Sequence, residues 1–143
     1  MITPLLFQIS RELRTALDRE SSQFGLTFPQ ASLLIRAARE PGGKLNELAP
    51  HVGTDNAGVT RLADKLESAG LVQRCAGSDR RSLGLALTEA GKALVPKLRK
   101  GLDRMNGDLT KDLSQADMTR LQKSLEHLLD CAKRANQAYE NES

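Results

Sequence analysis

The sequence is poor in cysteine and contains no tryptophan. Its 143 residues include two cysteines, Cys75 and Cys131, which lie far apart in the chain. Two isolated cysteines do not make the disulfide framework that stabilises many small secreted domains. We therefore expect a protein of the reducing cytoplasm.

Long hydrophobic runs are also absent. A helix that spans a bilayer needs about 20 consecutive apolar residues, and no stretch of the chain approaches that length. The first residues, MITPLLFQIS, lack the positive charges that open a secretory signal peptide. The Thr3-Pro4 pair is typical of a helix start instead, so we predict no association with a membrane.

Groups that carry out catalysis are scarce. The two histidines, His51 and His127, are far apart, and there is neither a glycine-rich phosphate loop nor a nucleophile elbow. The sequence therefore predicts neither an enzyme nor a bound cofactor. What it does contain is a hydrophobic content of 39%, enough for one domain-sized core, and a net charge of +3 that is compatible with a polyanionic partner.

Capping signals predict two helices in the first 40 residues. Thr3 is the expected N-cap of the first helix, with Pro4 in its first turn, and Gly25 ends it. Thr27 and Gln30 form a capping-box pattern that begins the second helix. The positions expected to point inward from the second helix are Ala31, Leu34, Ile35 and Ala38.

Residues 44–70 predict a short helix, a tight turn and a longer helix. Pro50 lies inside the short helix and removes one of its hydrogen bonds, which predicts a distorted or late-starting helix. Gly53-Thr54 forms the turn, and Asp55 caps the longer helix, which stops at Gly70. The apolar face of the longer helix consists of Val59, Leu62, Ala63 and Leu66.

A hairpin and two long helices complete the predicted order. Residues 71–76 and 83–87 read as strands on either side of a turn. The helix from Thr88 contains Gly101 and Gly107, each of which weakens it by about 1 kcal/mol relative to alanine, so we expect a bend or fraying. Ser114 and Asp117 begin the last helix, whose apolar stripe is Met118, Leu121, Leu125, Leu128, Ala132, Ala135 and Tyr139.

Apolar stripes therefore occur at both ends of the chain. A stripe with steps of three and four residues normally packs on a partner helix. The first helix carries a similar set, made up of Leu6, Ile9, Leu13, Ala16 and Leu17. We predict that the two ends pack on each other and on a second copy. The alternative is that both stripes face one intramolecular core.

The order helix, turn, helix and hairpin is that of a winged helix-turn-helix, a mainly α fold with a small β-hairpin wing. In such modules the second helix enters the major groove of DNA with its N-terminal residues in front. Amide, methyl, hydroxyl and guanidinium groups read base edges and phosphates. On this helix they belong to Asn56, Ala57, Thr60, Arg61 and Lys65, with Gly58 expected to leave a bare surface among them.

The hairpin tip carries Asp79, Arg80 and Arg81. Arginine suits the narrow, electronegative minor groove because its charge is permanent and weakly hydrated. Asp79 can orient Arg81 through a charge-assisted hydrogen bond. With Arg74 on the first strand, these residues complete the predicted DNA contacts. The alternative, a merely solvated turn, is disfavoured by the helix pair that precedes it.

Two stretches, ELAPHVGTDNAGVTRLADKLESAGLVQR and SDRRSLGLALTEAGKAL, together resemble the MarR family of bacterial transcriptional regulators. The matching features are the LA of the short helix, VTRL and GLV around the longer helix, DRR in the wing, and LT..G before the long helix. The resemblance is dense from Leu45 to Leu94 and continues as a helix pattern elsewhere. The ordered set is more specific than any one piece.

The resemblance implies a homodimer that binds a pseudo-palindromic operator in double-stranded DNA. Residues 1–25 and 100–143 would form a helical dimerisation region, and residues 26–99 the winged DNA-binding module. Most members of the family are repressors, and many release DNA when they bind a small aromatic or phenolic ligand. Arg81 would be the minor-groove arginine and Asp79 its orienting carboxylate. Such a protein is cytoplasmic and associated with the bacterial nucleoid.

The ligand crevice of the family lies between the dimerisation helices and the winged module. Aromatic and cationic side chains expected in that region could hold an aromatic anion. They are Phe7, Arg11, Arg14, Phe24 and Phe28.

Three alternatives stay open at this point. Cys75 follows Arg74, and a nearby cation favours the reactive thiolate, so redox sensing is one. His127 and Cys131 stand four residues apart on one helix, a spacing that can present two metal ligands, although no third ligand is identifiable. The last is a winged helix that contacts proteins or compacts the nucleoid without reading sequence.

Overall fold

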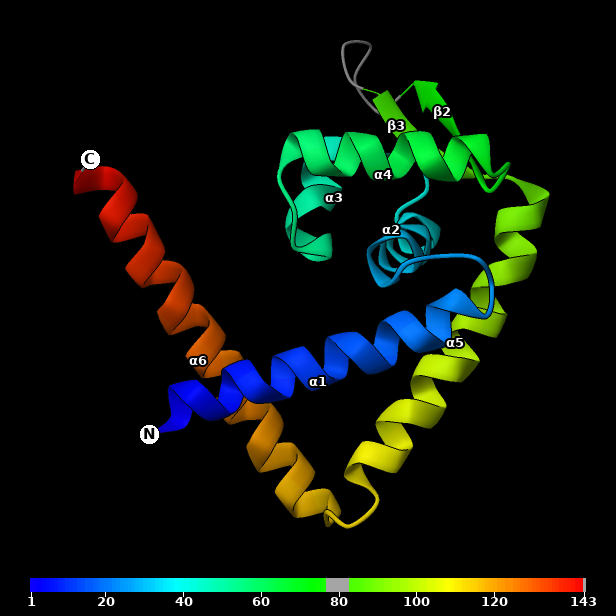
Figure 1. The fold of residues 1–143 in the computed structure, drawn as a ribbon. Helices are drawn as coiled ribbons and strands as arrows, with labels where there is room; N and C mark the ends of the chain where they lie inside the picture. Colours follow the sequence, from blue (N-terminus) through cyan, green and yellow to red (C-terminus); the bar gives the residue numbers. More distant parts are fainter. Residues whose placement is uncertain (77–82, 143) are drawn as a thin grey trace. The chain divides into compact units, whose positions relative to one another are not determined.

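The computed structural model describes residues 1–76 and 83–142 (Figure 1). Contacts divide the chain into two compact units, Met1–Arg104 and Met105–Ser143. The predicted mainly α architecture with a small sheet is confirmed within the described residues. The elements in chain order are α1 (Ile2–Ser22), α2 (Phe28–Arg39), β1 (Gly43–Lys44), α3 (Leu45–Val52), α4 (Asn56–Ser68), β2 (Val72–Ala76), β3 (Leu83–Leu87), α5 (Glu89–Thr110) and α6 (Gln115–Glu142).

The first helix begins earlier than its capping signal predicts. The expectation that Thr3 is the N-cap is wrong, because α1 starts at Ile2 with Met1 at the N-cap and no side-chain cap. Pro4 is tolerated inside the helix because the N–H groups of the first turn have no helical acceptor to lose. The predicted stop is confirmed: α1 ends at Ser22, and Gly25 follows with a φ of 71°.

Capping residues fix the starts of α2 and α4 as predicted. The Thr27–Gln30 capping box is present, with the Thr27 N–H donating to Gln30 Oε1 at 2.9 Å. Asp55 caps α4 by accepting the N–H of Gly58 at 2.7 Å. The late start expected from Pro50 does not occur, since α3 begins at Leu45 and contains Pro50 in its interior.

The sheet has three strands rather than the two predicted. β1 pairs antiparallel with β3, which also pairs with β2, giving the order β1-β3-β2. A strand of two residues carries no periodic pattern, which explains why the sequence did not reveal it. Gly84 permits the pairing, because a Cβ at that position would lie 2.4 Å from the carbonyl oxygen of Gly42.

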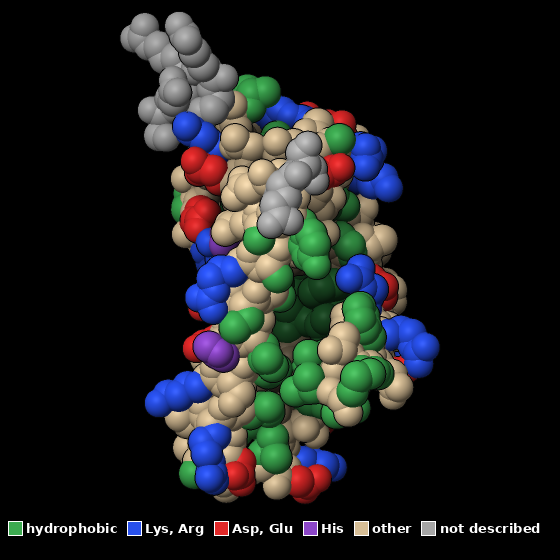
Figure 2. Space-filling view, turned by 90° about the vertical axis from the view of Figure 1, so that its left-hand side faces the viewer, with side chains coloured by type: hydrophobic (Ala, Val, Ile, Leu, Met, Phe, Trp, Pro, Cys, Tyr) green, Lys and Arg blue, Asp and Glu red, His purple; other side chains and the backbone are tan. Residues whose placement is uncertain are grey.

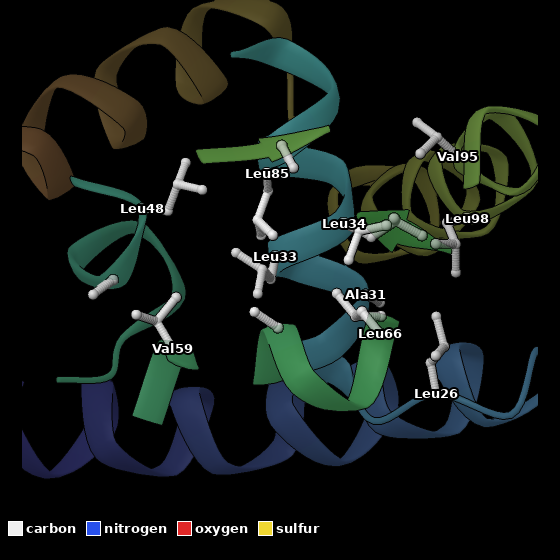
Figure 3. Close-up of a cluster of buried hydrophobic side chains, with 14 residues drawn as sticks. Leu26, Ala31, Leu33, Leu34, Leu48, Val59, Leu66, Leu85, Val95 and Leu98 are labelled. Atoms are coloured by element: carbon white, nitrogen blue, oxygen red, sulfur yellow. The ribbon is translucent and has the colours of Figure 1, made fainter. Parts of the chain in front are cut away.

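The core of the first unit gathers around α2 (Figure 3). The buried residues of this helix are Ala31, Leu33, Leu34 and Ala37. The predicted inward positions Ile35 and Ala38 are only half-buried, while Leu33 and Ala37 were missed. The reason is that α2 contacts α1, α3, α4 and β3, so more than one of its faces is covered.

The two long helices are continuous. Neither Gly101 nor Gly107 interrupts α5, which is helical from Glu89 to Thr110, so the fraying expected there does not occur. A Cβ at Gly101 would lie 3.0 Å from the Glu20 carboxylate, which pairs with Arg104 at 2.9 Å. Gly101 therefore provides room for α1 beside α5. In the second unit the predicted cap of α6 is confirmed, with the Asp117 N–H donating to Ser114 Oγ at 3.1 Å.

Candidate nucleic-acid interface

Helix α4 packs on α2 and α3 and contacts β2 (Figure 1). One face of α4 is packed into the core through Val59, Ala63 and Leu66. The opposite face is exposed and carries every residue predicted to read DNA from this helix, namely Asn56, Ala57, Thr60, Arg61 and Lys65.

Contacts within the chain change what two of these positions offer. The expectation that Gly58 leaves a bare surface is wrong: Gly58 is buried, and a Cβ there would lie 1.8 Å from the hydroxyl oxygen of Thr54. The hydroxyl of Thr60 donates to the Asn56 carbonyl at 2.9 Å. Its proton is therefore used inside the helix, and Thr60 presents a methyl group and an oxygen acceptor outward.

Arg74 ties the first wing strand to α4. Its guanidinium donates to Asp64 and, at 3.1 Å, to Glu67, while its backbone N–H donates to Glu67 at 3.0 Å. The hydrogen bond to Asp64 and the charges of both carboxylates raise the pKa of the Arg74 guanidinium above its usual value. Because folding raises this pKa, the stabilisation is complete below the unfolded-state pKa and is lost only as the pH rises through the folded-state pKa. Both values lie far above neutral pH, so Arg74 adds no pH dependence to stability near neutrality.

The wing tip completes the predicted interface only in part. Asp79, Arg80 and Arg81 lie outside the described residues, so their assignment to the minor groove stays a prediction. The strands that lead to and from the tip are described and pair in register, with Ala76 opposite Leu83. The structure thus places the base of the wing beside the exposed face of α4.

Comparison with known proteins agrees with this geometry. A model described as the MarR family matches residues 26–83, which cover α2 to the start of β3. The chain is also 29% identical over 126 residues to the HTH-type transcriptional regulator SarZ of Staphylococcus haemolyticus, covering 87% of this chain and 84% of that protein. The chain is therefore similar to the MarR family, most clearly over the winged module. Its relatives are transcriptional regulators.

Two solved structures of Mycobacterium tuberculosis proteins share the fold. The MarR family protein Rv2887, in complex with salicylic acid, is 29% identical, with 90% of this chain and 96% of that one covered and a TM-score of 0.70. The transcriptional regulator MOSR, in complex with DNA, is 25% identical, with 94% and 98% covered and a TM-score of 0.76. Both likenesses extend over nearly the whole chain.

The residues predicted to hold an effector do not line one common hollow. Phe28 lines a hollow of about 250 Å³ with Arg36 and His51, whereas Arg14 lines a different hollow beside α4. Arg11 pairs with Glu12 on the exposed surface of α1. Phe7 is also exposed, and Phe24 is half-buried against the core.

Sequence reasoning missed Arg36 and His51. Arg36 Nη2 lies 2.6 Å from Glu40 Oε1 and 3.1 Å from His51 Nε2, and its Nε is buried without a hydrogen-bond partner. The Arg36–Glu40 spacing is an ordinary surface pair on a helix. Only the packing of α3 against α2, which no local pattern encodes, brings His51 to this arginine.

The cysteines occupy different surroundings. Cys75 follows Arg74 on β2, but neighbouring side chains on a strand point to opposite faces, so the guanidinium that is held against α4 points away from the thiol. On α6, Cys131 Sγ is 3.6 Å from His127 Nε2 and accepts from Arg134 at 3.3 Å. Among the described residues no group of three or more potential ligands could hold a metal ion.

None of the described helices combines the length and the apolar content that a bilayer-spanning helix requires.

The Arg74 contacts predict a measurable link between wing and helix. Arg74→Met keeps the apolar stem and removes the charge, so we expect a loss of about 1 kcal/mol in the free energy of unfolding, together with weaker DNA binding. Denaturant titration and a binding isotherm measure both. Arg99→Met removes an exposed arginine of α5 that has no partner within the described residues, and should leave stability within about 0.5 kcal/mol.

Neutralising the carboxylates distinguishes this role from a direct contact with DNA. If Arg74 acts by holding α4 to the wing, the double variant Asp64→Asn, Glu67→Gln should also bind DNA more weakly. Tighter binding by that variant would contradict the positioning role, because it would mean that the carboxylates only withhold Arg74 from the phosphates.

Proposed function

We propose that this chain is a MarR-family, ligand-responsive repressor that binds a pseudo-palindromic operator in double-stranded DNA as a homodimer. The observation that carries the proposal is the exposed face of α4. Its amide, methyl and cationic groups project from a helix that is capped by Asp55, packed through its opposite face and tied to the wing by Arg74. A rigid helix loses little entropy when it enters the major groove.

The relatives support DNA as the partner. MOSR was crystallised with DNA, and its chain is similar to this one over 94% of the length. A wing that ends in Asp79, Arg80 and Arg81 would supply the minor-groove contacts that the family resemblance implies. The same comparison argues against an enzyme, and we propose that the protein has no catalytic activity, needs no cofactor and works in the cytoplasm at the bacterial nucleoid.

Uncovered apolar side chains on the terminal helices support a homodimer. Leu125 and Phe7 are 43% and 73% exposed in the single chain. Figure 2 shows hydrophobic side chains open to solvent on one side of the molecule, bordered by Lys and Arg. Large apolar side chains that are exposed on the two helices are Ile2, Leu5, Phe7 and Ile9 of α1, and Leu121, Leu125, Leu129 and Tyr139 of α6.

A second copy would cover these surfaces. Within the second unit, the end of α5 and α6 enclose a groove of about 460 Å³ whose apolar wall includes Leu109, Met118 and Leu125. Large exposed apolar side chains that gather on one helix commonly mark a protein–protein interface. We therefore assign residues 1–25 and 100–143 to dimerisation and residues 26–99 to DNA binding, although α1 packs with the winged module inside one chain.

The ligand proposed is a small aromatic or phenolic molecule. Rv2887 was crystallised with salicylic acid. In this chain the hollow beside Phe28 combines an aromatic ring with Arg36, whose Nε is buried and without a partner. A carboxylate or phenolate would satisfy that donor, and the ring would cover Phe28. This assignment replaces the scattered set of Phe7, Arg11 and Arg14 by residues that share one hollow.

Selection of genomic DNA fragments by the purified protein tests the proposal. We expect recurrent enrichment of a short motif with approximate two-fold symmetry, because two α4 helices related by a dimer axis read two half-sites. Fragments recovered without any common motif would contradict operator recognition. They would favour general compaction of the nucleoid instead.

A further inference from the structure

A hollow of about 290 Å³ lies beside α4, on the flank that faces α1 and α2. Three cationic side chains line it: Arg14 from α1, and Arg61 and Lys65 from α4. The turn before α4 contributes Thr54, whose hydroxyl fits there because Gly58 has no Cβ. Residues from distant parts of the sequence thus converge on one small cavity.

Among the described residues no hydrogen bond or ion pair engages the side chains of Arg14, Arg61 or Lys65. By contrast, other arginines each pair with a carboxylate, namely Arg11, Arg36, Arg74, Arg104 and Arg120. Asp18 on α1 and Asp55 at the start of α4 accept backbone N–H groups and form no ion pair among the described residues. Asp18 accepts the N–H of Phe28 at 2.8 Å, and Asp55 accepts that of Gly58 at 2.7 Å.

The three cationic side chains line one hollow and repel one another, and an anion between them would relieve that repulsion. A phosphate group suits the site, because arginine donates to two phosphate oxygens at once, lysine adds a point charge and a hydroxyl adds a further donor. A phosphate group is also much smaller than the cavity. The shared chemistry is therefore that of a phosphate, either free or in a nucleic acid.

We infer that the hollow receives a phosphate of the DNA backbone and that Arg14 is the residue that completes it. The inference rests on the proposed function, which puts the exposed face of α4 in the major groove. The phosphates that border the groove then face the flanks of α4, where Arg61 and Lys65 open into the hollow. Arg14 makes α1 a DNA-contacting helix, held in place by the Asp18–Phe28 bond.

The test is the salt dependence of DNA binding by Arg14→Gln. Each phosphate contact adds about −0.9 to the slope of log K against log salt. Loss of one contact in each subunit should therefore make the slope of the dimer shallower by about 1.8. Affinity should fall about tenfold per half-site, and equally for operator and mixed-sequence duplex, because phosphates carry no sequence information. Arg14→Lys should restore most of the slope. Arg11→Gln is the matched control, since Arg11 is on the same helix but pairs with Glu12.

Each outcome decides the inference. An Arg14→Gln protein that is folded and keeps the parental slope overturns it. Calorimetric titration with inorganic phosphate separates the two phosphate sources. Binding of free phosphate that depends on Arg14, combined with an unchanged DNA slope, would mean a site for a free anion and would also overturn it. If the parent protein binds no duplex at all, the proposed function fails first and the inference falls with it. If the parent protein binds DNA and Arg14→Gln leaves the salt dependence unchanged, only the inference fails and the proposed function stands.

Discussion

Ala57→Glu is expected to abolish DNA binding while the protein stays folded. Ala57 is exposed at the second position of α4, on the face proposed to enter the major groove. A carboxylate there meets phosphates and base acceptors, and like-charge contacts at an interface cost several kcal/mol. We expect a loss of about 3 kcal/mol or more per half-site, measured by titration against the selected operator.

The fold should not suffer, because a glutamate in the first turn interacts favourably with the helix dipole. Ala116→Glu is the matched control: Ala116 is the exposed second residue of α6, so the same charge is added at the same helical position away from α4. The role assigned to α4 would be untenable if both variants bound the operator as the parent does.

Gly91→Ala is expected to destabilise the protein, against the trend of helix propensity. In the interior of a helix alanine is favoured over glycine by about 1 kcal/mol. At Gly91, however, a Cβ would lie 2.1 Å from the carbonyl oxygen of Leu71. Because the obstacle is backbone, the start of α5 must move away from the turn before β2, and such overpacking costs about 1–3 kcal/mol.

Gly107→Ala on the same helix provides the comparison. A Cβ there has no neighbour within 4 Å, so only propensity acts and the free energy of unfolding should rise by up to about 1 kcal/mol. Urea titrations of the two variants should therefore move in opposite directions. If Gly91→Ala were as stabilising as Gly107→Ala, the close approach of α5 to Leu71 would be refuted.

The sequence predicted those parts of the fold that depend on local signals. Capping patterns at Thr27 and Asp55 and the glycine stop at Gly25 are statements about neighbouring residues, and the structure confirms each. Strand β1 was not predicted because two residues are too few to show a periodic pattern. Its pairing also depends on the close fit of Gly42 against Gly84, which is far away in the chain.

The candidate site shows the same division. Exposure of Asn56 and Arg61 follows from the periodicity of α4, so the reading face was predictable. The partners of Arg74 were not, since Asp64 and Glu67 reach it only after β2 has folded back along α4. The sequence places Arg14 on the first helix, but only the fold brings it to the hollow that Arg61 and Lys65 also line.

The most direct test of operator recognition by a dimer compares the affinities of the purified protein for the selected operator and for a scrambled duplex at one fixed salt concentration. Sedimentation then gives the mass of each complex. The account predicts two chains on each operator and a preference of about 1,000-fold or more over the scrambled sequence. Equal affinities for the two duplexes, or a single chain on the operator, would contradict it.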